Sequence, residues 1–171
     1  AYLFLAHADV APNEVFPLAR AASLQAIRID PGSPEAHLAH GRVLQLVEWN
    51  WPRAEAELRR ALELAPNLAE ARMSLAHVLV ATGRFEAGLA EIARAREEEP
   101  LSPLANALEG GFMVAAGRGK QAHACLERAF ALEPGFWIAL LLRAGLALEA
   151  GNAADAVGDL ENPRLDGKAT V

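Results

Sequence analysis

Prolines recur at a fixed spacing along the chain, and this period constrains the fold more than any other feature of the sequence. Pro66, Pro100 and Pro134 are evenly spaced, since 100 − 66 and 134 − 100 both equal 34. An alanine stands five residues before each proline, and a glycine marks another fixed point at Gly83, Gly117 and Gly151. A fixed period of this length indicates an array in which each repeat is one supersecondary unit.

The residues within one period predict two helices. Residues 54–64 and 69–82 both place apolar side chains at helical spacing. Ser33-Pro34 and Ser102-Pro103 each supply an N-cap residue followed by a first-turn proline. The three periodic glycines stand where a helix is expected to end in a left-handed residue. No period-two alternation persists, so the chain is predicted to be all-α.

One repeat is longer than the others, because Pro31 lies 35 residues before Pro66. Aligning "GRFEAG" with "EWNWPRA" places the extra residue within 49–53, in the turn between two helices. We interpret Trp51 as a packing residue at the start of the second helix, with Asn50 as its N-cap, and Trp49 as the filler of the turn. The alternative is a stacking platform for a ligand, which requires both rings exposed on one face with cations nearby.

A helix–turn–helix period of 34 residues, with small residues at the helix crossings, resembles the tetratricopeptide repeat family over residues 1–161. The family's small and terminal positions fall on Gly41, Ala54, Ala61 and Pro66, on Leu75, Ala76, Ala95 and Pro100, and on Gly110, Ala122, Ala129 and Pro134. The resemblance implies an α-solenoid, a right-handed superhelix of antiparallel helix pairs. About five repeats are expected, at 1–33, 34–68, 69–102, 103–136 and 137–161, the first and last incomplete or atypical, with a tail at 162–171.

The family binds partner proteins in a groove lined by the first helices of successive repeats, so the resemblance implies a scaffold without catalytic activity. The groove positions carry over to Glu35, Leu38, Arg42 and Gln45, to Glu70, Met73, His77 and Val80, to Leu104, Ala107, Gly111 and Val114, and to Ile138, Leu141, Gly145 and Leu148. Some relatives hold a carboxylate with clustered basic residues, but Ser74 and Leu104 stand where such residues are needed. The C-terminal half of the groove is apolar and suits a helix or an apolar segment.

The stretch "EWNWPRAEAELRRALELAPN" resembles tetratricopeptide segments that follow signalling domains in bacterial proteins, such as winged-helix, cyclase or kinase domains. This implies a regulatory module of a larger protein, and the alternative is a self-association domain that controls an attached effector. Residues 136–151 are apolar nearly all round, so we expect Ile138, Leu141 and Leu148 to contribute to an exposed apolar patch. A second copy, a partner helix or the rest of the protein would fill it.

Composition limits the remaining classes of partner and compartment. The net charge of −6 argues against a nucleic-acid partner for this segment. The longest apolar run, residues 136–142, is far shorter than the ~20 residues that span a bilayer. The single cysteine, Cys125, cannot form an internal disulfide, which fits a cytoplasmic protein. Because the chain begins with Ala1, we expect it to be a piece of a longer protein.

The sequence offers no persuasive catalytic, cofactor or metal motif. It lacks a glycine-rich phosphate loop and the CxxC, HExxH and GxSxG patterns. His37 and His40 are three residues apart and His7 could approach them, but zinc needs three or four ligands. Hydrogen-bonded core histidines are the expected alternative. Glu109, Arg143 and Gly119 depart from the family pattern, which has leucine at the first two positions and an aromatic residue at the third.

Overall fold

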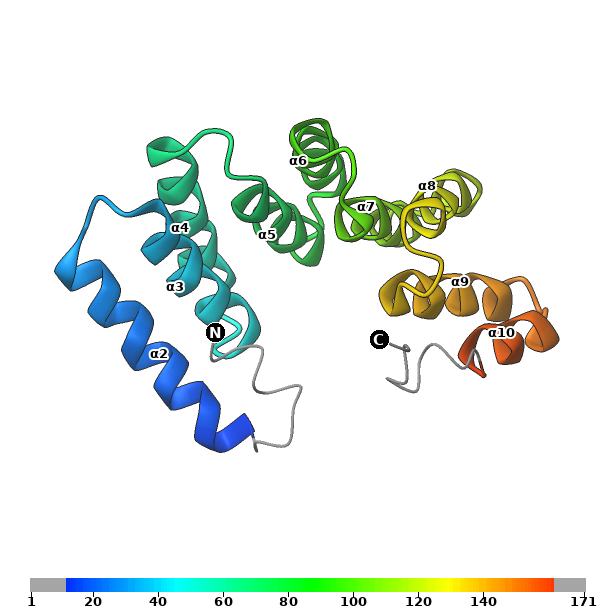
Figure 1. The fold of residues 1–171 in the computed structure, drawn as a ribbon, viewed down its shortest axis with the longest axis horizontal. Coiled ribbons are helices and arrows are strands. Elements are labelled where there is room, and N and C mark those ends of the chain that lie inside the picture. The colour runs from blue at the N-terminus through cyan, green and yellow to red at the C-terminus, as the bar shows by residue number, and fades with distance from the viewer. Residues whose placement is uncertain (1–11, 162–171) are drawn as a thin grey trace. The chain divides into compact units, whose positions relative to one another are not determined.

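The computed structural model describes residues 12–161, which form nine helices and no strand. The helices follow one another as a succession of hairpins, coloured along the chain in Figure 1. Their bounds are α2 (Pro12–Ile29), α3 (Pro34–Leu46), α4 (Trp51–Leu64), α5 (Ala69–Ala81), α6 (Phe85–Glu98), α7 (Pro103–Ala115), α8 (Gly119–Leu132), α9 (Trp137–Glu149) and α10 (Ala153–Leu160). The all-α prediction is therefore confirmed, and His7 lies outside the described residues.

The chain divides into two compact units, residues Ala1–Glu91 and Ile92–Val171, called here the N-terminal and C-terminal units. The N-terminal unit contains α2 to α5 and the first half of α6. The C-terminal unit contains the second half of α6 and α7 to α10. In each unit, a first helix packs against the second helix of its own repeat and against neighbouring first helices.

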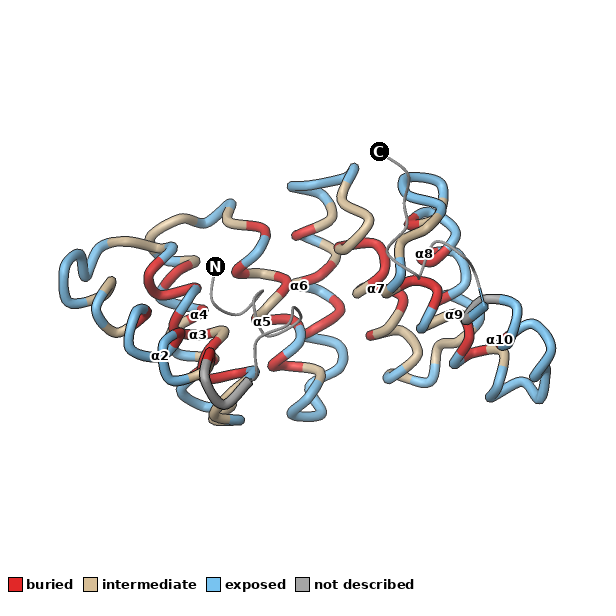
Figure 2. The backbone as a smooth tube through the Cα atoms, turned by 60° about the horizontal axis from the view of Figure 1, so that its bottom comes forward, coloured by how far each residue is buried: buried red, intermediate tan, exposed pale blue. Residues whose placement is uncertain are grey.

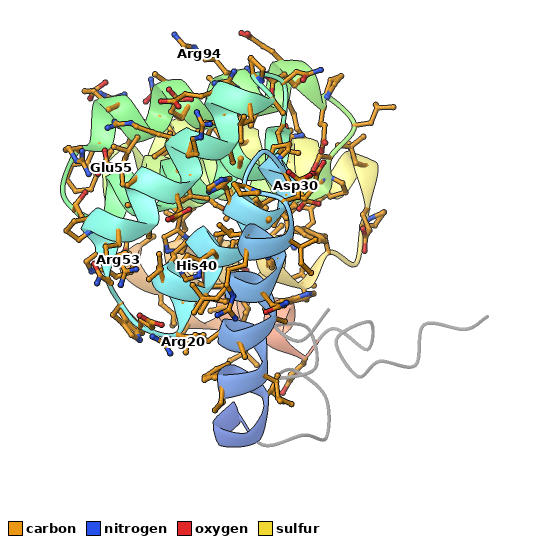
Figure 3. The ribbon with its side chains drawn as sticks, turned by 90° about the vertical axis from the view of Figure 1, so that its left-hand side faces the viewer. Arg20, Asp30, His40, Arg53, Glu55 and Arg94 are labelled. Atoms are coloured by element: carbon orange, nitrogen blue, oxygen red, sulfur yellow. The ribbon has the colours of Figure 1, made fainter. Side chains whose placement is uncertain are left out.

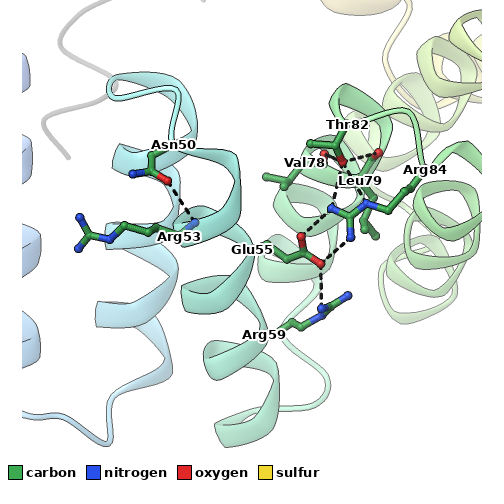
Figure 4. Close-up of polar contacts among 8 residues, drawn as sticks. All are labelled: Asn50, Arg53, Glu55, Arg59, Val78, Leu79, Thr82 and Arg84. Atoms are coloured by element: carbon green, nitrogen blue, oxygen red, sulfur yellow. Dashed lines mark hydrogen bonds and ion pairs between the residues drawn. The ribbon is translucent and has the colours of Figure 1, made fainter.

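Helix bounds follow from the capping residues that the sequence supplies. The hydroxyls of Ser33 and Ser102 each accept a hydrogen bond of 3.2 Å, from the backbone N–H of Ala36 and Ala105 respectively. The Asn50 side chain caps α4 by accepting from the N–H of Arg53 at 3.3 Å (Figure 4). These contacts satisfy N–H groups that the first helical turn leaves without partners.

The turn after α3 differs from the sequence-based prediction by one residue. Gly83, Gly117 and Gly151 end their helices with φ of 79°, 73° and 78°, and Trp49 has the same left-handed conformation with φ of 54°. The N–H of Asn50 donates to the carbonyl of Leu44 just as the N–H of Arg84 donates to that of Leu79. Trp49 therefore occupies the glycine position of the other repeats. The inserted residue is Glu48, and the predicted range of 49–53 was wrong by one position.

The core of each repeat lies where its two helices cross. A Cβ built on Gly41 would lie 2.9 Å from Leu58, and one on Gly110 would lie 2.9 Å from Leu126. Both leucines are completely buried. The buried residues in Figure 2 follow the inner faces of the helix pairs, where these crossings occur. Small residues at the crossing are thus required by the distance between the helices.

The two tryptophans of the inserted turn have different surroundings. Trp51 is half-buried and packs against the core cluster of the N-terminal unit, which includes Leu58, Leu75 and Leu79. The Trp49 residue is 69% exposed and contacts Trp51 edge to face, with ring centroids 5.5 Å apart. The packing interpretation therefore fits Trp51, whereas Trp49 lies on the surface of the turn.

We predict that these tryptophans differ sharply in their contribution to stability. Trp51→Ala should lower the free energy of unfolding by about 3 kcal/mol, because it removes an aromatic ring from the core. Trp49→Gly should change it by less than about 1 kcal/mol, since losing the edge contact is offset by relief of the left-handed backbone. Urea unfolding measures both. Equal losses in the two variants would contradict the assignment.

Candidate partner-binding faces

The first helices of the N-terminal unit share a polar face. The guanidinium of Arg42 on α3 lies 3.7 Å from the carboxylate of Glu70 on α5, so the two side chains reach across adjacent helices. Glu35 and His77 are also exposed on these helices. His77 occupies the position in its repeat that Arg42 occupies in the preceding one. The structure therefore places Arg42 beside Glu70, and the spacing of seven residues puts Glu35 on the same side of α3 as Arg42 and His77 on the same side of α5 as Glu70.

His77 is the residue of this face whose ordinary pKa lies nearest to neutral pH. Desolvation by the surrounding protein lowers its pKa below the ordinary histidine value of 6.5, although the residue remains accessible to solvent. A side chain with protein atoms close around it and water on one side favours the neutral imidazole. At neutral pH, His77 thus presents one donor and one acceptor and no charge.

In the N-terminal unit, three residues predicted to line the groove are buried, which corrects the prediction at these positions. Leu38 packs into the core cluster of the N-terminal unit, and Met73 and Gln45 are also covered. The Gln45 Oε1 atom is buried without a hydrogen-bond partner. Val80 is half-buried, and its Cγ2 atom would lie 2.6 Å from a Cβ on Gly88. These side chains fill the space between helices, because the groove positions also face the neighbouring helix.

The corresponding face of the C-terminal unit is apolar. Leu104, Gly111 and Val114 of α7 are half-buried, and Ala107 is fully buried against α9. Ile138 is half-buried and packs against the core cluster of this unit. Leu141 and Leu148 are 47% and 57% exposed. The expected apolar surface on α9 therefore includes the two leucines, while Ile138 belongs mainly to the core.

Two polar bridges, missed by the sequence analysis, each connect the first and second helices of one repeat, at equivalent positions of two successive repeats. His37 contacts the Glu57 carboxylate through Nδ1 at 2.6 Å and the Pro31 carbonyl through Nε2 at 3.0 Å. One repeat later, Arg72 donates to the Glu91 carboxylate at 2.9 Å and to the Pro66 carbonyl. A basic or imidazole side chain thus holds a carboxylate of the second helix and the carbonyl of the preceding proline. The sequence could have indicated these bridges, because His37 and Arg72 occupy the same position of successive repeats, as do Glu57 and Glu91.

A second connection in the N-terminal unit fixes the turn between α5 and α6. Figure 4 shows Glu55 of α4 accepting two hydrogen bonds from Arg84, at 2.9 and 2.6 Å. Arg59 lies 2.8 Å from the same carboxylate. The hydrogen bonds from Arg84 hold the pKa of Glu55 below its ordinary value. The Glu55 carboxylate on this side of the repeat is therefore paired with two arginines of the same unit.

His37 and His40 do not form a shared metal-binding pair. His37 contacts Glu57 and Pro31. The Nδ1 atom of His40, the residue labelled on α3 in Figure 3, lies 3.2 Å from the hydroxyl of Ser23 on α2. Among the described residues, no group of three or more His, Cys, Asp or Glu side chains is arranged to hold a metal ion. Within the same residues, no helix combines the length and apolarity needed to cross a membrane.

Sequence and structure comparisons agree with this architecture. Two sequence profiles, both described as tetratricopeptide repeat, match residues 50–110 and 114–162. The chain is built of tetratricopeptide repeats. A search of curated protein sequences finds no match.

Solved structures of tetratricopeptide solenoids resemble the chain in fold. A thermophilic TPR protein of Thermus thermophilus gives a TM-score of 0.78 at 20% identity, covering 85% of this chain and 80% of that chain. PilW, a type IV pilus biogenesis factor, gives 0.78 at 24% identity, covering 90% and 72%. MamA gives 0.69 at 20% identity, covering 92% of both chains. At these identities the likeness establishes the α-solenoid fold.

Glu109, which departs from the repeat pattern, is the centre of a buried charged cluster in the C-terminal unit. Its carboxylate accepts a hydrogen bond of 2.9 Å from Arg128 on α8 and lies 3.1 Å from Nε of Arg96 on α6. Arg128 also donates to Asn106 Oδ1 at 3.1 Å and contacts the buried Cys125 thiol at 3.2 Å. Burial raises the pKa of Cys125, which favours an inert thiol.

The other two departures also have structural consequences. The Arg143 guanidinium lies over the Phe130 ring, 4.1 Å from its centroid, so it packs where an apolar residue is usual. A Cβ built on Gly119 would lie 3.6 Å from Leu146, an ordinary contact distance. A cleft of about 570 Å³ lies among α8, α9 and α10. His123, Arg143, Asn152 and Asp155 contribute its polar lining.

We predict that lowering the pH reduces the free energy of unfolding, because His40 becomes protonated in the unfolded chain before it does so in the folded protein. Burial lowers the His40 pKa in the folded protein below the ordinary 6.5, so unfolding takes up a proton between these two pKa values. Stability contributed by neutral His40 is present above pH 6.5 and is lost as pH falls through the folded pKa. The slope from this residue is at most about 1.4 kcal/mol per pH unit.

Urea unfolding at several pH values, compared with His40→Gln, measures this slope. The variant should show a shallower dependence than the wild type between pH 7 and the folded pKa, whatever its absolute stability. Nearby charged groups on three elements, Arg20, Glu48, Arg53 and Glu57, are unchanged by the substitution. Identical slopes would show that another group controls the pH dependence.

We predict that two substitutions of Glu109 have different effects. Glu109→Ala should lower the free energy of unfolding by about 2–3 kcal/mol, because it leaves a cavity and two arginines without their carboxylate. Glu109→Leu should be within about 1 kcal/mol of the wild type, because Leu75 fills the equivalent position of the preceding repeat. Thermal unfolding of both variants tests this, and a larger loss for leucine than for alanine would contradict it.

Proposed function

We propose that the chain acts by binding, as a scaffold whose polar first-helix face in the N-terminal unit holds a segment of a partner protein. Tetratricopeptide repeats are typical interaction scaffolds that bind partners on their first-helix side. The observation that carries the proposal is the pairing of the half-buried Arg42 with the exposed Glu70 of the adjacent first helix, which also carries the exposed His77. Binding residues on rigid neighbouring helices are already in position before the partner arrives.

The chemistry of this face favours a polar segment that includes a carboxylate. Arg42 and Glu70 form an ion pair of 3.7 Å with the carboxylate 60% exposed, and such surface pairs contribute only about 0–1 kcal/mol. A carboxylate of a partner can therefore compete with Glu70 for Arg42. Glu35 and the neutral imidazole of His77 provide further acceptors and a donor, so an extended peptide with free backbone N–H groups fits this face.

We also infer that the scaffold is a regulatory module of a larger bacterial protein in the cytoplasm. The resemblance of residues 48–67 to segments that follow signalling domains supports a regulatory context. The single, buried cysteine is compatible with a reducing compartment. The second candidate function is self-association, favoured by the exposed leucines of α9.

We predict that charge reversal on the polar face weakens partner binding without unfolding the chain. Peptides selected by display on the whole chain should lose at least about tenfold in affinity for Arg42→Glu, because the attraction for a carboxylate becomes repulsion. His77→Ala should weaken the same peptides, since it removes a donor and an acceptor. Fluorescence anisotropy with labelled peptides measures both changes.

Arg60→Glu provides a matched control. Arg60 lies exposed on α4, a second helix, where it pairs with the nearby Glu63 of the same helix. This variant has the same change in net charge as Arg42→Glu and should bind the peptides like the wild type. If the selected peptides bind Arg42→Glu and His77→Ala with unchanged affinity, the polar face is not the binding site.

A further inference from the structure

An uncharged stripe runs along the exposed side of α9 in the C-terminal unit. It consists of Trp137, Leu141, Gly145 and Leu148, and is called here the α9 stripe. Trp137 is 50% exposed, and the two leucines are exposed to a similar extent. Their spacing of four, four and three residues places all four on one side of the helix. Three large apolar side chains in one line differ from the scattered exposed residues that any surface carries.

The equivalent side of the preceding first helix, α7, is in contact with another helix. Ala107 of α7 corresponds to Leu141, since 141 − 107 equals the period of 34, and it is completely buried. Gly111 corresponds to Gly145, and a Cβ on Gly111 would lie 3.2 Å from the side chain of Leu142 on α9. The same construction on Gly145 meets nothing within 4 Å. The α9 stripe therefore exposes the surface that α7 buries beneath another helix.

We propose that the α9 stripe is the contact surface for a second copy of this chain, through an antiparallel pair of α9 helices that cross at Gly145. Leu141 precedes Gly145 by four residues and Leu148 follows it by three. A two-fold axis at Gly145 reverses the chain direction, and so places Leu141 of one copy beside Leu148 of the other. The stripe is thus close to self-complementary, as a two-fold interface requires.

The missing side chain at Gly145 allows the two backbones to approach at the axis. Helices pack at closer distances where small residues meet, and the flanking leucines then interdigitate. The contact of Leu142 with Gly111 shows that a leucine of one first helix fills a glycine position of another in this same unit. In the proposed interface, Gly145 of each copy faces Gly145 of the other, and the leucines on either side pack beside them.

Electrostatics favour the antiparallel arrangement. The stripe carries no charge, so a two-fold contact brings no like charges together. Helix α9 has no acidic residue in its first turn and no basic residue in its last turn. An antiparallel copy places opposite ends of the two helix dipoles side by side, and directs Glu149 of one copy toward the N-terminal half of the other helix.

The size of the surface sets the expected affinity. A single helix-to-helix contact buries less than the roughly 800 Å² per partner of a standard interface. We therefore expect a dissociation constant in the micromolar range or weaker, with monomer and dimer exchanging as concentration changes. This surface uses other residues than the polar face of α3 and α5. The inference deepens the second candidate function, self-association, and does not depend on partner binding at the polar face.

Sedimentation equilibrium on the whole chain, from about 5 to about 500 µM, tests the proposal. The mass should rise from 18.2 kDa toward twice that value as concentration increases. Gly145→Leu should weaken dimerisation at least tenfold, because its side chain lies in open space in the monomer but at the axis of the dimer. Leu141→Glu combined with Leu148→Glu should give a monomer throughout the range.

Gly158→Leu is the matched control, because Gly158 lies on α10, outside the stripe, and is also surrounded by open space. It should dimerise like the wild type. Gly145→Cys should form an intermolecular disulfide on mild oxidation, since residues on a two-fold axis face each other, whereas Gly158→Cys should not. The natural Cys125 is buried and should remain reduced.

A mass of 18.2 kDa at every concentration would overturn the proposal and leave the stripe to a helix of another protein. A dimer that Gly145→Leu leaves unchanged, or equal cross-linking through Gly145→Cys and Gly158→Cys, would overturn the assigned surface. Peptides that bind the polar face should bind Gly145→Leu like the wild type. Failure of the dimer proposal is therefore distinguishable from failure of the proposed partner binding.

Discussion

The close approach of the two helices in each repeat is the constraint on which the rest of this structure depends. At Gly41 and Gly110 the facing leucine, Leu58 or Leu126, lies where a β-carbon would meet it at 2.9 Å. The leucine is completely buried in both cases. A larger residue at the crossing would separate the helices and shift the residues that bridge them, because packed cores accommodate extra volume poorly.

This fixed helix spacing explains how polar residues occupy positions that the repeat pattern usually gives to apolar ones. His37 and Arg72 each reach a carboxylate on the second helix and the carbonyl before the first helix, so their buried polar atoms are satisfied. The buried Glu109 carboxylate is likewise paired, with one arginine from each of two other helices. Because these bridges use the second-helix side, the polar groups of the first-helix face remain accessible to a partner.

Repeat arrays are stabilised by contacts between neighbours, so a residue's exposure depends on which neighbour follows it. Leu38 is buried in the core of the N-terminal unit, whereas Leu141, at the same position of its repeat, is exposed on α9. The same position of the repeat therefore lies in a core at one place and on the surface at another. This separates the two proposed contacts, a polar one for a partner segment and an apolar one for a second copy.

The sequence by itself determined the repeat period, the helix pairs, the glycine turns and the residues at the helix crossings, because these depend on local spacing and backbone preference. It also indicated Arg42 and His77 as exposed groove residues. Only the tertiary structure decided that Glu48 is the inserted residue, that Leu38, Gln45 and Met73 are covered, and that Glu109 meets Arg96 and Arg128. The physical reason is that periodicity shows which side of a helix faces inward, whereas burial and ion pairing depend on side chains contributed by other helices.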